Sequence, residues 1–205
     1  MSAQTRRRFL AASAVTCTAI AGCLASDDEG NPDEIDTAER PALGSADAPV
    51  RVTVFEDFSC PGCRQFKEQI FPLIVEHHVE PGDVRVLPAD FPIPVEEPWS
   101  WAVPNAARAV FEETGNDAYW GFTQAIYTHQ GNYSYDTIES VADEAGDVGA
   151  TARDAAENRA YSDAIDADID RGEAWGVGGT PTVFVEETMV DSDYESISDA
   201  IDDEL

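Results

Sequence analysis

The first part of the chain's apolar pattern alternates between short runs and a longer helical period. Val50–Phe55 and Asp83–Ala89 are short, largely apolar segments, which predicts two buried strands. Between them, apolar residues such as Phe66 and Ile70 recur at helical spacing, so Gly62 to about His78 is predicted to be a helix. The order strand, helix, strand is the beginning of a βαβ unit.

The pattern then changes to a series of helices. Glycines at 115, 131 and 146 follow three of them and are expected to end them, because glycine adopts the left-handed conformation at little cost. The predicted helices are Pro104–Thr114, Asp117 to about His129, Tyr135–Ala145 and Thr151–Arg171. A strand, Thr182–Val185, and a helix, Asp191–Leu205, close the chain. The pattern predicts one α/β domain, residues 43–205, interrupted by a helical insertion at about 98–174.

The N-terminus has the pattern of an export signal. Arg6–Arg8 precede an apolar stretch, Phe9–Ile20, that is too short to span a bilayer. The paired arginines resemble a twin-arginine signal, and Ile20-Ala-Gly-Cys23 resembles a lipobox, in which the cysteine becomes the lipidated first residue. We expect residues 1–22 to be removed and the lipid on Cys23 to anchor the protein to the outer face of the cytoplasmic membrane. An uncleaved signal anchor is the alternative.

Residues 23–42 differ in composition from the domain that follows. They are acidic, contain Gly30, Pro32 and Pro41, and have almost no apolar side chains to bury. Apolar burial cannot offset the entropy of ordering such a segment. It is therefore predicted to be a tether between the membrane and a domain of about 160 residues.

The strongly acidic composition indicates a medium of high salt and argues against a nucleic-acid partner. The chain has 41 acidic and 12 basic residues, a formal net charge of −29, and a single lysine, Lys67. Binding to nucleic acid is not expected, because it requires clustered Lys and Arg. The acidic residues are spread through apolar-periodic sequence, which is typical of a halophile's surface, and molar salt would screen their repulsion over about 3 Å. In these features the chain resembles exported lipoproteins of haloarchaea.

A Cys-Pro-Gly-Cys sequence stands at 60–63, where the first strand turns into the first helix. Unpaired N–H groups and the helix dipole favour a thiolate at Cys60, while Cys63, one turn further on, is positioned to attack a mixed disulfide formed there. These two residues are the predicted catalytic pair. A zinc site would need two more ligands, and neither the histidines nor the N-terminal cysteines have that spacing. A purely structural disulfide across so short a loop would contribute little.

From about Gly44 to Leu205 the chain resembles DsbA-like thiol–disulfide oxidoreductases of the thioredoxin superfamily. The resemblance is carried by Ala48-Pro-Val, by the Phe-x-Asp-Phe-x-Cys-Pro-x-Cys pattern ending at Cys63, by the helical insertion, and by the Gly-Gly-Thr-Pro-Thr sequence at 178–182. It implies a thioredoxin fold with an inserted helical subdomain. It also implies that Pro181 is cis and lies against the active-site disulfide, and that Thr180 offers backbone hydrogen bonds to a bound substrate polypeptide.

One position departs from the pattern of the family. Many relatives carry a buried carboxylate six residues before the first cysteine, where it assists proton transfer, and this chain has Val54 there. Strand periodicity puts Glu56 on the same face, so it could serve as the proton relay, or it could be a solvated acid. Arg64 and Lys67 lie close to one helical face, where they could favour the thiolate or simply be exposed.

Large aromatic side chains concentrate at the start of the predicted insertion. Most should belong to the core, and some could line an apolar groove for an unfolded client beside Cys60. They are Trp99, Trp101, Tyr119, Trp120 and Phe122.

The sequence therefore predicts an enzyme that forms or exchanges disulfides in exported polypeptides through a mixed disulfide at Cys60, without a cofactor or metal. A membrane redox partner would recycle it. A stabilised Cys60 thiolate would make the enzyme an oxidant. Two alternatives stay open: a thiol reductase, for instance in cytochrome maturation, and a binding protein or holdase in which the cysteines only brace the site.

Overall fold

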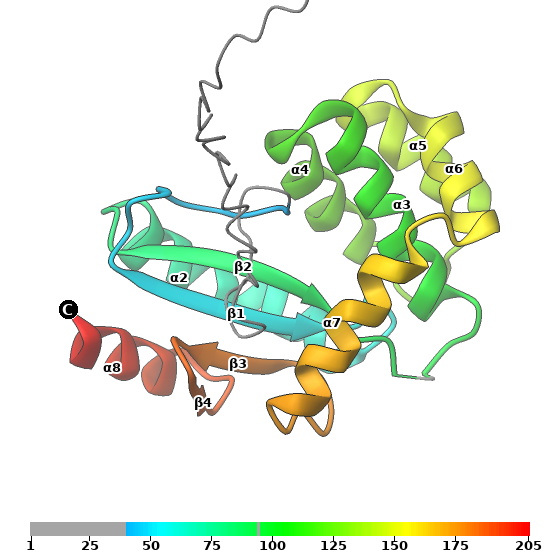
Figure 1. The fold of residues 1–205 in the computed structure, drawn as a ribbon. Helices are drawn as coiled ribbons and strands as arrows, with labels where there is room; N and C mark the ends of the chain where they lie inside the picture. The colour runs from blue at the N-terminus through cyan, green and yellow to red at the C-terminus, as the bar shows by residue number, and fades with distance from the viewer. Residues whose placement is uncertain (1–39, 94) are drawn as a thin grey trace, which may run out of the picture. The chain divides into compact units, whose positions relative to one another are not determined.

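Four strands form one mixed sheet in the computed structural model, which describes residues 40–93 and 95–205 (Figure 1). The strands are β1 (Val50–Glu56), β2 (Val84–Asp90), β3 (Thr182–Val185) and β4 (Thr188–Val190), in the order β2-β1-β3-β4. β1 and β2 are parallel, whereas β3 is antiparallel to both β1 and β4. The predicted α/β class and three of the strands are confirmed, and β4 was missed because three residues are too few for a periodic signal.

A continuous helical run, Pro61–Val79, follows β1 and confirms the first predicted helix. It consists of α1 (Pro61–Gln65), the π-helical turn η1 (Phe66–Ile70), α2 (Phe71–Ile74) and a second π-helical turn η2 (Val75–Val79), and we call it the α1–η2 helix. Pro72 has no N–H to give to a preceding carbonyl, which interrupts the regular α-helical bonding. The N–H of Phe71, just before it, bonds to Phe66 O, five residues back, as in a π-helix.

The helical insertion differs from the prediction at several boundaries. It comprises α3 (Trp99–Thr114), α4 (Asn116–Tyr127), α5 (Tyr135–Gly146) and α6 (Gly149–Asn158). The prediction that α3 starts at Pro104 was wrong, because Trp101 and Ala102 already donate to Pro98 O and the proline lies inside the helix. Gly115 has a positive φ of 86° as expected, but Gly146 is helical and Asp147 takes the left-handed position instead.

The single helix predicted for Thr151–Arg171 is two helices. α6 ends at Asn158, and Arg159, which follows it, has a left-handed φ of 53°. α7 (Ser162–Ala174) begins three residues after Arg159. Asn105 fixes this break, since its buried side-chain carbonyl accepts the N–H of Tyr161 at 2.6 Å. This contact joins residues far apart in the sequence, so local periodicity could not predict it. The last helix, α8, spans Tyr194–Glu204.

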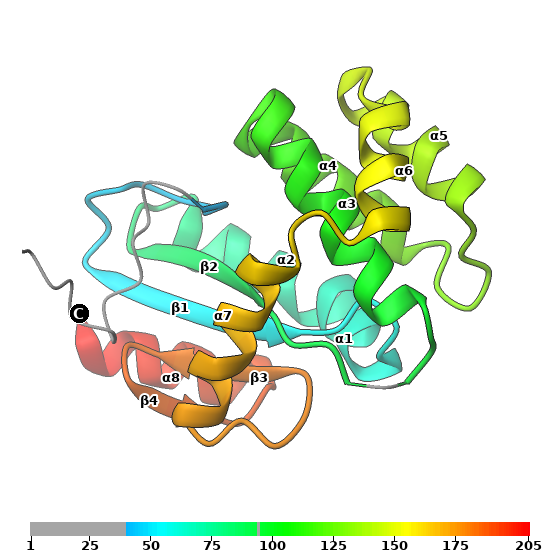
Figure 2. The same cartoon turned by 45° about the vertical axis from the view of Figure 1, so that its right-hand side comes forward.

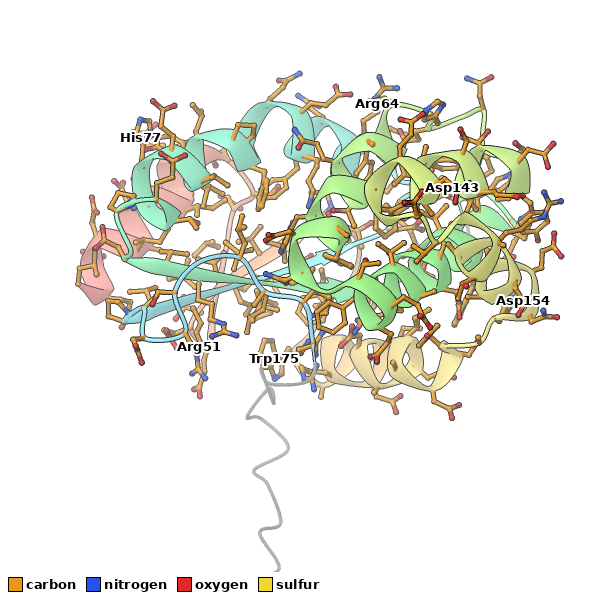
Figure 3. All side chains as sticks on the ribbon, turned by 90° about the horizontal axis from the view of Figure 1, so that it is seen from above. Arg51, Arg64, His77, Asp143, Asp154 and Trp175 are labelled. Atoms are coloured by element: carbon orange, nitrogen blue, oxygen red, sulfur yellow. The ribbon has the colours of Figure 1, made fainter. Side chains whose placement is uncertain are left out.

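Helices cover both faces of the sheet. The α1–η2 helix and α8 lie on one face, and their apolar side chains pack with those of β1, such as Val52 and Val54. α7 crosses the other face (Figure 2), where Phe55 and Phe184 pack with Trp175. Figure 3 shows Trp175 on the opposite side of the sheet from Arg64 and His77 of the α1–η2 helix. The insertion α3–α6 packs around a further core beside this sheet, which Phe58, Cys60 and Cys63 share.

A buried ion cluster ties together the segments where the insertion leaves and rejoins the sheet. Asp168 of α7 accepts hydrogen bonds from Arg40 at 2.8 Å, Arg108 of α3 at 2.6 Å and Arg171 at 3.0 Å. Arg108 also bonds to Asp90 at the end of β2. Arg40 thus packs within the domain, although the sequence places it in the tether; residues 1–39, with the predicted signal and Cys23, lie outside the described residues.

No helix in residues 40–93 or 95–205 is long and apolar enough to cross a bilayer.

Asp168→Asn should reduce the free energy of unfolding by about 3 kcal/mol, because the substitution leaves three clustered arginines without their shared carboxylate. Urea unfolding at constant salt measures the change. Asp166→Asn, at an exposed position of the same helix, is the control and should stay within about 0.5 kcal/mol of the wild type. Equal midpoints for the two variants would contradict a stabilising role for the cluster.

Candidate active site

The two cysteines lie where the end of β1 meets the α1–η2 helix. Cys60 is the N-cap residue of α1, with φ −77° and ψ 121°, and Pro61 occupies the first helical position, where its missing N–H costs nothing. Cys63 lies one turn further along and is completely buried, whereas Cys60 is 7% exposed. Both are free thiols. Their unequal exposure agrees with the predicted order of an attacking thiol followed by a resolving one.

The segment before β3 approaches the thiols from the other side. The Cys60 Sγ lies 3.3 Å from Thr180 O, and the Thr180–Pro181 peptide bond is cis, as the resemblance implied. A Cβ on Gly62 would come within 3.2 Å of the Pro181 ring, so glycine at this position permits the close approach. The structure thus brings Cys60, Cys63, Thr180 and Pro181 together from segments about 120 residues apart.

The surroundings shift the pKa values of the two thiols in opposite directions. The pKa of Cys60 is lowered to about 5, although partial burial opposes this shift. The largest cause is the hydrogen bond from the Cys63 thiol, and smaller contributions come from the Thr180 side chain and from the backbone N–H groups of Cys63 and Gly62. The pKa of Cys63 is raised well above its ordinary value, chiefly because the thiol is buried. The hydrogen bond that Cys63 donates to Cys60 and the charge of Glu56 raise it further. Near neutral pH the pair is therefore one thiolate and one thiol.

Glu56 is buried beneath the thiols and is not a solvated acid. Its side chain accepts a hydrogen bond from the Tyr127 hydroxyl at 3.1 Å and lies 3.5 Å from the Lys67 ammonium. Val54 packs in the apolar core on the same face of β1, so the structure confirms the expected placement of the two residues. Burial raises the pKa of Tyr127 well above its ordinary value, and its hydroxyl therefore remains a donor to Glu56.

Lys67 and Arg64 have different surroundings, although they are only three residues apart. Lys67 is 8% exposed and its ammonium lies 4.4 Å from the centre of the Phe71 ring and 4.7 Å from that of Trp120. Of the two alternatives left open by the sequence, the exposed helix face is therefore wrong for Lys67. Arg64 lies on the outer side of the helix (Figure 3) and pairs with Glu68 at 2.7 Å.

The aromatic residues of the insertion belong mainly to the core, as predicted. Tyr119 and Phe122 are fully buried and the three tryptophans are half-buried. A cavity of about 560 Å³ is lined by Lys67, Phe71 and Trp120. Neither cysteine lines it, so among the described residues it does not supply the expected apolar groove beside Cys60.

Sequence reasoning missed three residues that hold the loop before Cys60. Asp57 is buried, accepts the N–H groups of Ser59 at 2.7 Å and Ile93 at 2.9 Å, and has its pKa raised to about 6 chiefly by burial. Gln130 and Tyr133 bond to the backbone of the same loop. Only Asp57 left a signal, through its place in the Phe-x-Asp-Phe-x-Cys pattern; the other two lie about 70 residues away in the sequence.

Comparison with known families agrees with this arrangement. A family model described as thioredoxin matches residues 36–203, which is most of the chain. The chain belongs to the thioredoxin family.

Relatives within the thioredoxin family share most of their length with this chain. The probable disulfide bond formation protein D of Bacillus cereus is 29% identical over 172 residues, which cover 80% of this chain and 78% of the relative. Disulfide bond formation protein D of Bacillus subtilis is 25% identical over 176 residues, covering 81% and 77%.

Solved structures of the thioredoxin family confirm the fold with its helical insertion. Oxidised BdbD of Bacillus subtilis superposes with a TM-score of 0.75 at 24% identity, covering 82% of this chain and 93% of that one. DsbA of Chlamydia trachomatis gives a TM-score of 0.70 at 19% identity, covering 84% and 94%. The thioredoxin fold of this chain is thus of the DsbA-like kind.

Alkylation of the reduced protein should have its half-maximal rate near pH 5, because the thiolate of Cys60 is the reactive form and its pKa is about 5. The rate should be flat above about pH 7, and peptide mapping should find Cys63 unmodified in the native state. Iodoacetamide rates measured across this range test both points. A rate that still climbs toward about pH 8.5, as for an ordinary cysteine, would contradict the stabilisation of the thiolate.

Proposed function

We propose that this chain is a DsbA-like thiol–disulfide oxidoreductase that forms or exchanges disulfides in exported polypeptides through Cys60 and Cys63. The observation that carries the proposal is the asymmetry of the pair, in which the more exposed sulfur has the lowered pKa and the buried sulfur the raised one. The relatives named for disulfide bond formation support the same activity.

The proposed reaction begins with the oxidised Cys60–Cys63 pair. A client thiolate attacks the Cys60 sulfur, the Cys60–Cys63 bond breaks, and Cys63 leaves with the electron pair and takes up a proton. A second client thiolate then attacks the client sulfur of this mixed disulfide, which forms the client disulfide and releases Cys60 as a thiolate. Two electrons pass from client to enzyme, and a membrane redox partner would remove them again.

The lowered pKa of Cys60 favours the oxidising direction over the reducing one. A thiolate that is stabilised in the folded protein stabilises the reduced enzyme and is also a good leaving group in the second step. A holdase function is less well supported, because none of the five aromatic side chains at the start of the insertion is fully exposed.

Thr180 and Pro181 would bind the client beside the reacting sulfur. Thr180 O lies 3.3 Å from the Cys60 Sγ, so a client strand that contacts this backbone would bring its own sulfur within reach of Cys60. Backbone hydrogen bonds do not depend on the client's sequence, which suits an enzyme that acts on many polypeptides.

Export and anchoring complete the proposal. The residue pattern at 1–22 would direct export by the twin-arginine route, and a lipid on Cys23 would hold the mature protein at the outer face of the membrane through the acidic tether. A single acyl chain anchors only marginally, so this attachment requires a dual-chain lipid. The formal charge of −29 suits a working medium of high salt.

Cys63→Ser should accumulate mixed disulfides with clients, because the resolving thiol is lost while Cys60 remains reactive. Non-reducing gels of the purified, reduced variant incubated with an unfolded protein that still holds its disulfides detect the adducts, because the Cys60 thiolate attacks a client disulfide and releases one client thiol. Cys60→Ser is the matched control and should form none. If Cys63→Ser forms no adducts under conditions in which the reduced wild type exchanges with the disulfides of the same client, the proposed mechanism is wrong.

Glu56→Gln tests the proton relay. If Glu56 exchanges the Cys63 proton, the variant should resolve mixed disulfides about a hundredfold more slowly at neutral pH, while the alkylation rate of Cys60 stays unchanged. If the Glu56 charge only raises the pKa of Cys63, its removal should make resolution faster, and the relay is refuted. Stopped-flow oxidation of the reduced enzyme by oxidised glutathione separates the two results, because Cys63 must then lose its proton and resolve the mixed disulfide at Cys60. Exposed Glu76→Gln is the control.

A further inference from the structure

Three side chains from the insertion converge on the segment that carries Cys60. The Tyr127 hydroxyl donates to the carboxylate of Glu56, and the Tyr133 hydroxyl donates to Phe58 O at 2.8 Å. Gln130 lies between them in the sequence, and its side-chain nitrogen donates to Phe58 O at 2.8 Å and to Cys60 O at 2.9 Å. The helical insertion therefore contacts the active-site loop through polar bonds as well as through apolar packing.

Gln130 occupies the central position in this contact. Its amide nitrogen has two hydrogens, and it uses them on the carbonyls of Phe58 and Cys60, which flank Ser59. Asp57 holds the Ser59 N–H from the other side at 2.7 Å. The Cys60 carbonyl also accepts the Arg64 N–H at 3.2 Å, so Gln130 bonds to the residue at which the helix begins.

We propose that Gln130 is a positioning residue for Cys60, through which the helical insertion holds the attacking sulfur against the donors that stabilise its thiolate. This inference rests on the proposed function. The thiolate depends on N–H groups of Gly62 and Cys63 that can reach the sulfur only while Cys60 keeps its extended N-cap conformation. Gln130 fixes the peptide group that follows Cys60, through Cys60 O, and the one that precedes Ser59, through Phe58 O, while the Cys60 N–H bonds to Asp57 O at 2.9 Å.

The electrostatic effect of the Gln130 amide, like the position of its two hydrogen bonds, favours the Cys60 thiolate. Each carbonyl oxygen that Gln130 binds carries partial negative charge in the segment that holds the sulfur, and an N–H donor offsets part of that charge. The other titratable groups near the sulfur, Cys63, Asp57 and Glu56, are unchanged when Gln130 alone is replaced. Loss of the amide should therefore make the thiolate less stable by both routes.

Gln130→Leu tests the inference, because leucine keeps much of the side-chain volume and removes both donors. Thiolate absorbance titrated with pH should give a Cys60 midpoint about one unit above the wild type. In equilibrium with glutathione, the reduced form should be disfavoured by about tenfold. Tyr133→Phe should produce a smaller shift in the same direction, because Phe58 O keeps its bond to Gln130.

Gln124→Leu, at an exposed position of α4, is the matched control and should titrate like the wild type. Gln130→Asn, which is polar but too short to reach both carbonyls, provides a second reading if the leucine variant does not fold, and its midpoint should also rise. An unchanged midpoint in a folded Gln130→Leu or Gln130→Asn protein would overturn the inference. A wild type that fails to oxidise dithiols would instead refute the proposed function.

Discussion

The hydrogen bond between the Cys63 thiol and the Cys60 thiolate is the interaction on which the rest of the site depends. It makes the largest contribution to the lowered pKa of Cys60, and it also helps to raise the pKa of Cys63. The proton of this bond stays on Cys63, because Cys63 is the more deeply buried sulfur and burial disfavours its charged form. The Cys-Pro-Gly-Cys turn provides this difference by placing Cys60 at the N-cap and Cys63 one turn inside.

Each layer of the fold contributes one part of that environment. β1 ends beneath the thiols with Glu56, the segment before β3 brings Thr180 alongside the Cys60 sulfur, and the insertion holds the loop through Gln130 and Tyr133. The buried cluster around Asp168 ties α3 and α7 to the end of β2, so the insertion and the sheet have a fixed relation where the chain passes between them. The chemistry of two atoms therefore depends on contacts between segments that are distant in the sequence.

The sequence predicted those features of the structure that depend on residues close together in the chain. The helix after Cys60 and the strands β1 to β3 follow from periodicity, whereas the approach of Pro181 to the thiols was implied only by the resemblance to DsbA-like proteins. The burial of Lys67 does not follow, because its helical position looks exposed until Trp120 of the insertion covers it. Asn105 interrupts a helix that was predicted to be continuous, and Gln130 bonds to the active-site loop. Both contacts join residues far apart in the sequence, so local patterns could not predict them. Polar side chains that act across the fold leave little periodic signal, whereas apolar ones do.

The dependence of the reduction potential on pH tests the central claim most directly, because it counts the protons that accompany two electrons. If Cys60 is a thiolate and Cys63 a thiol in the reduced enzyme, reduction takes up one proton. The potential should then fall by about 30 mV per pH unit between about pH 7 and 8, above the pKa of Asp57, which is about 6. Equilibration with glutathione buffers measures it. A slope of about 59 mV per unit in this range would mean that both thiols are protonated and would contradict the account.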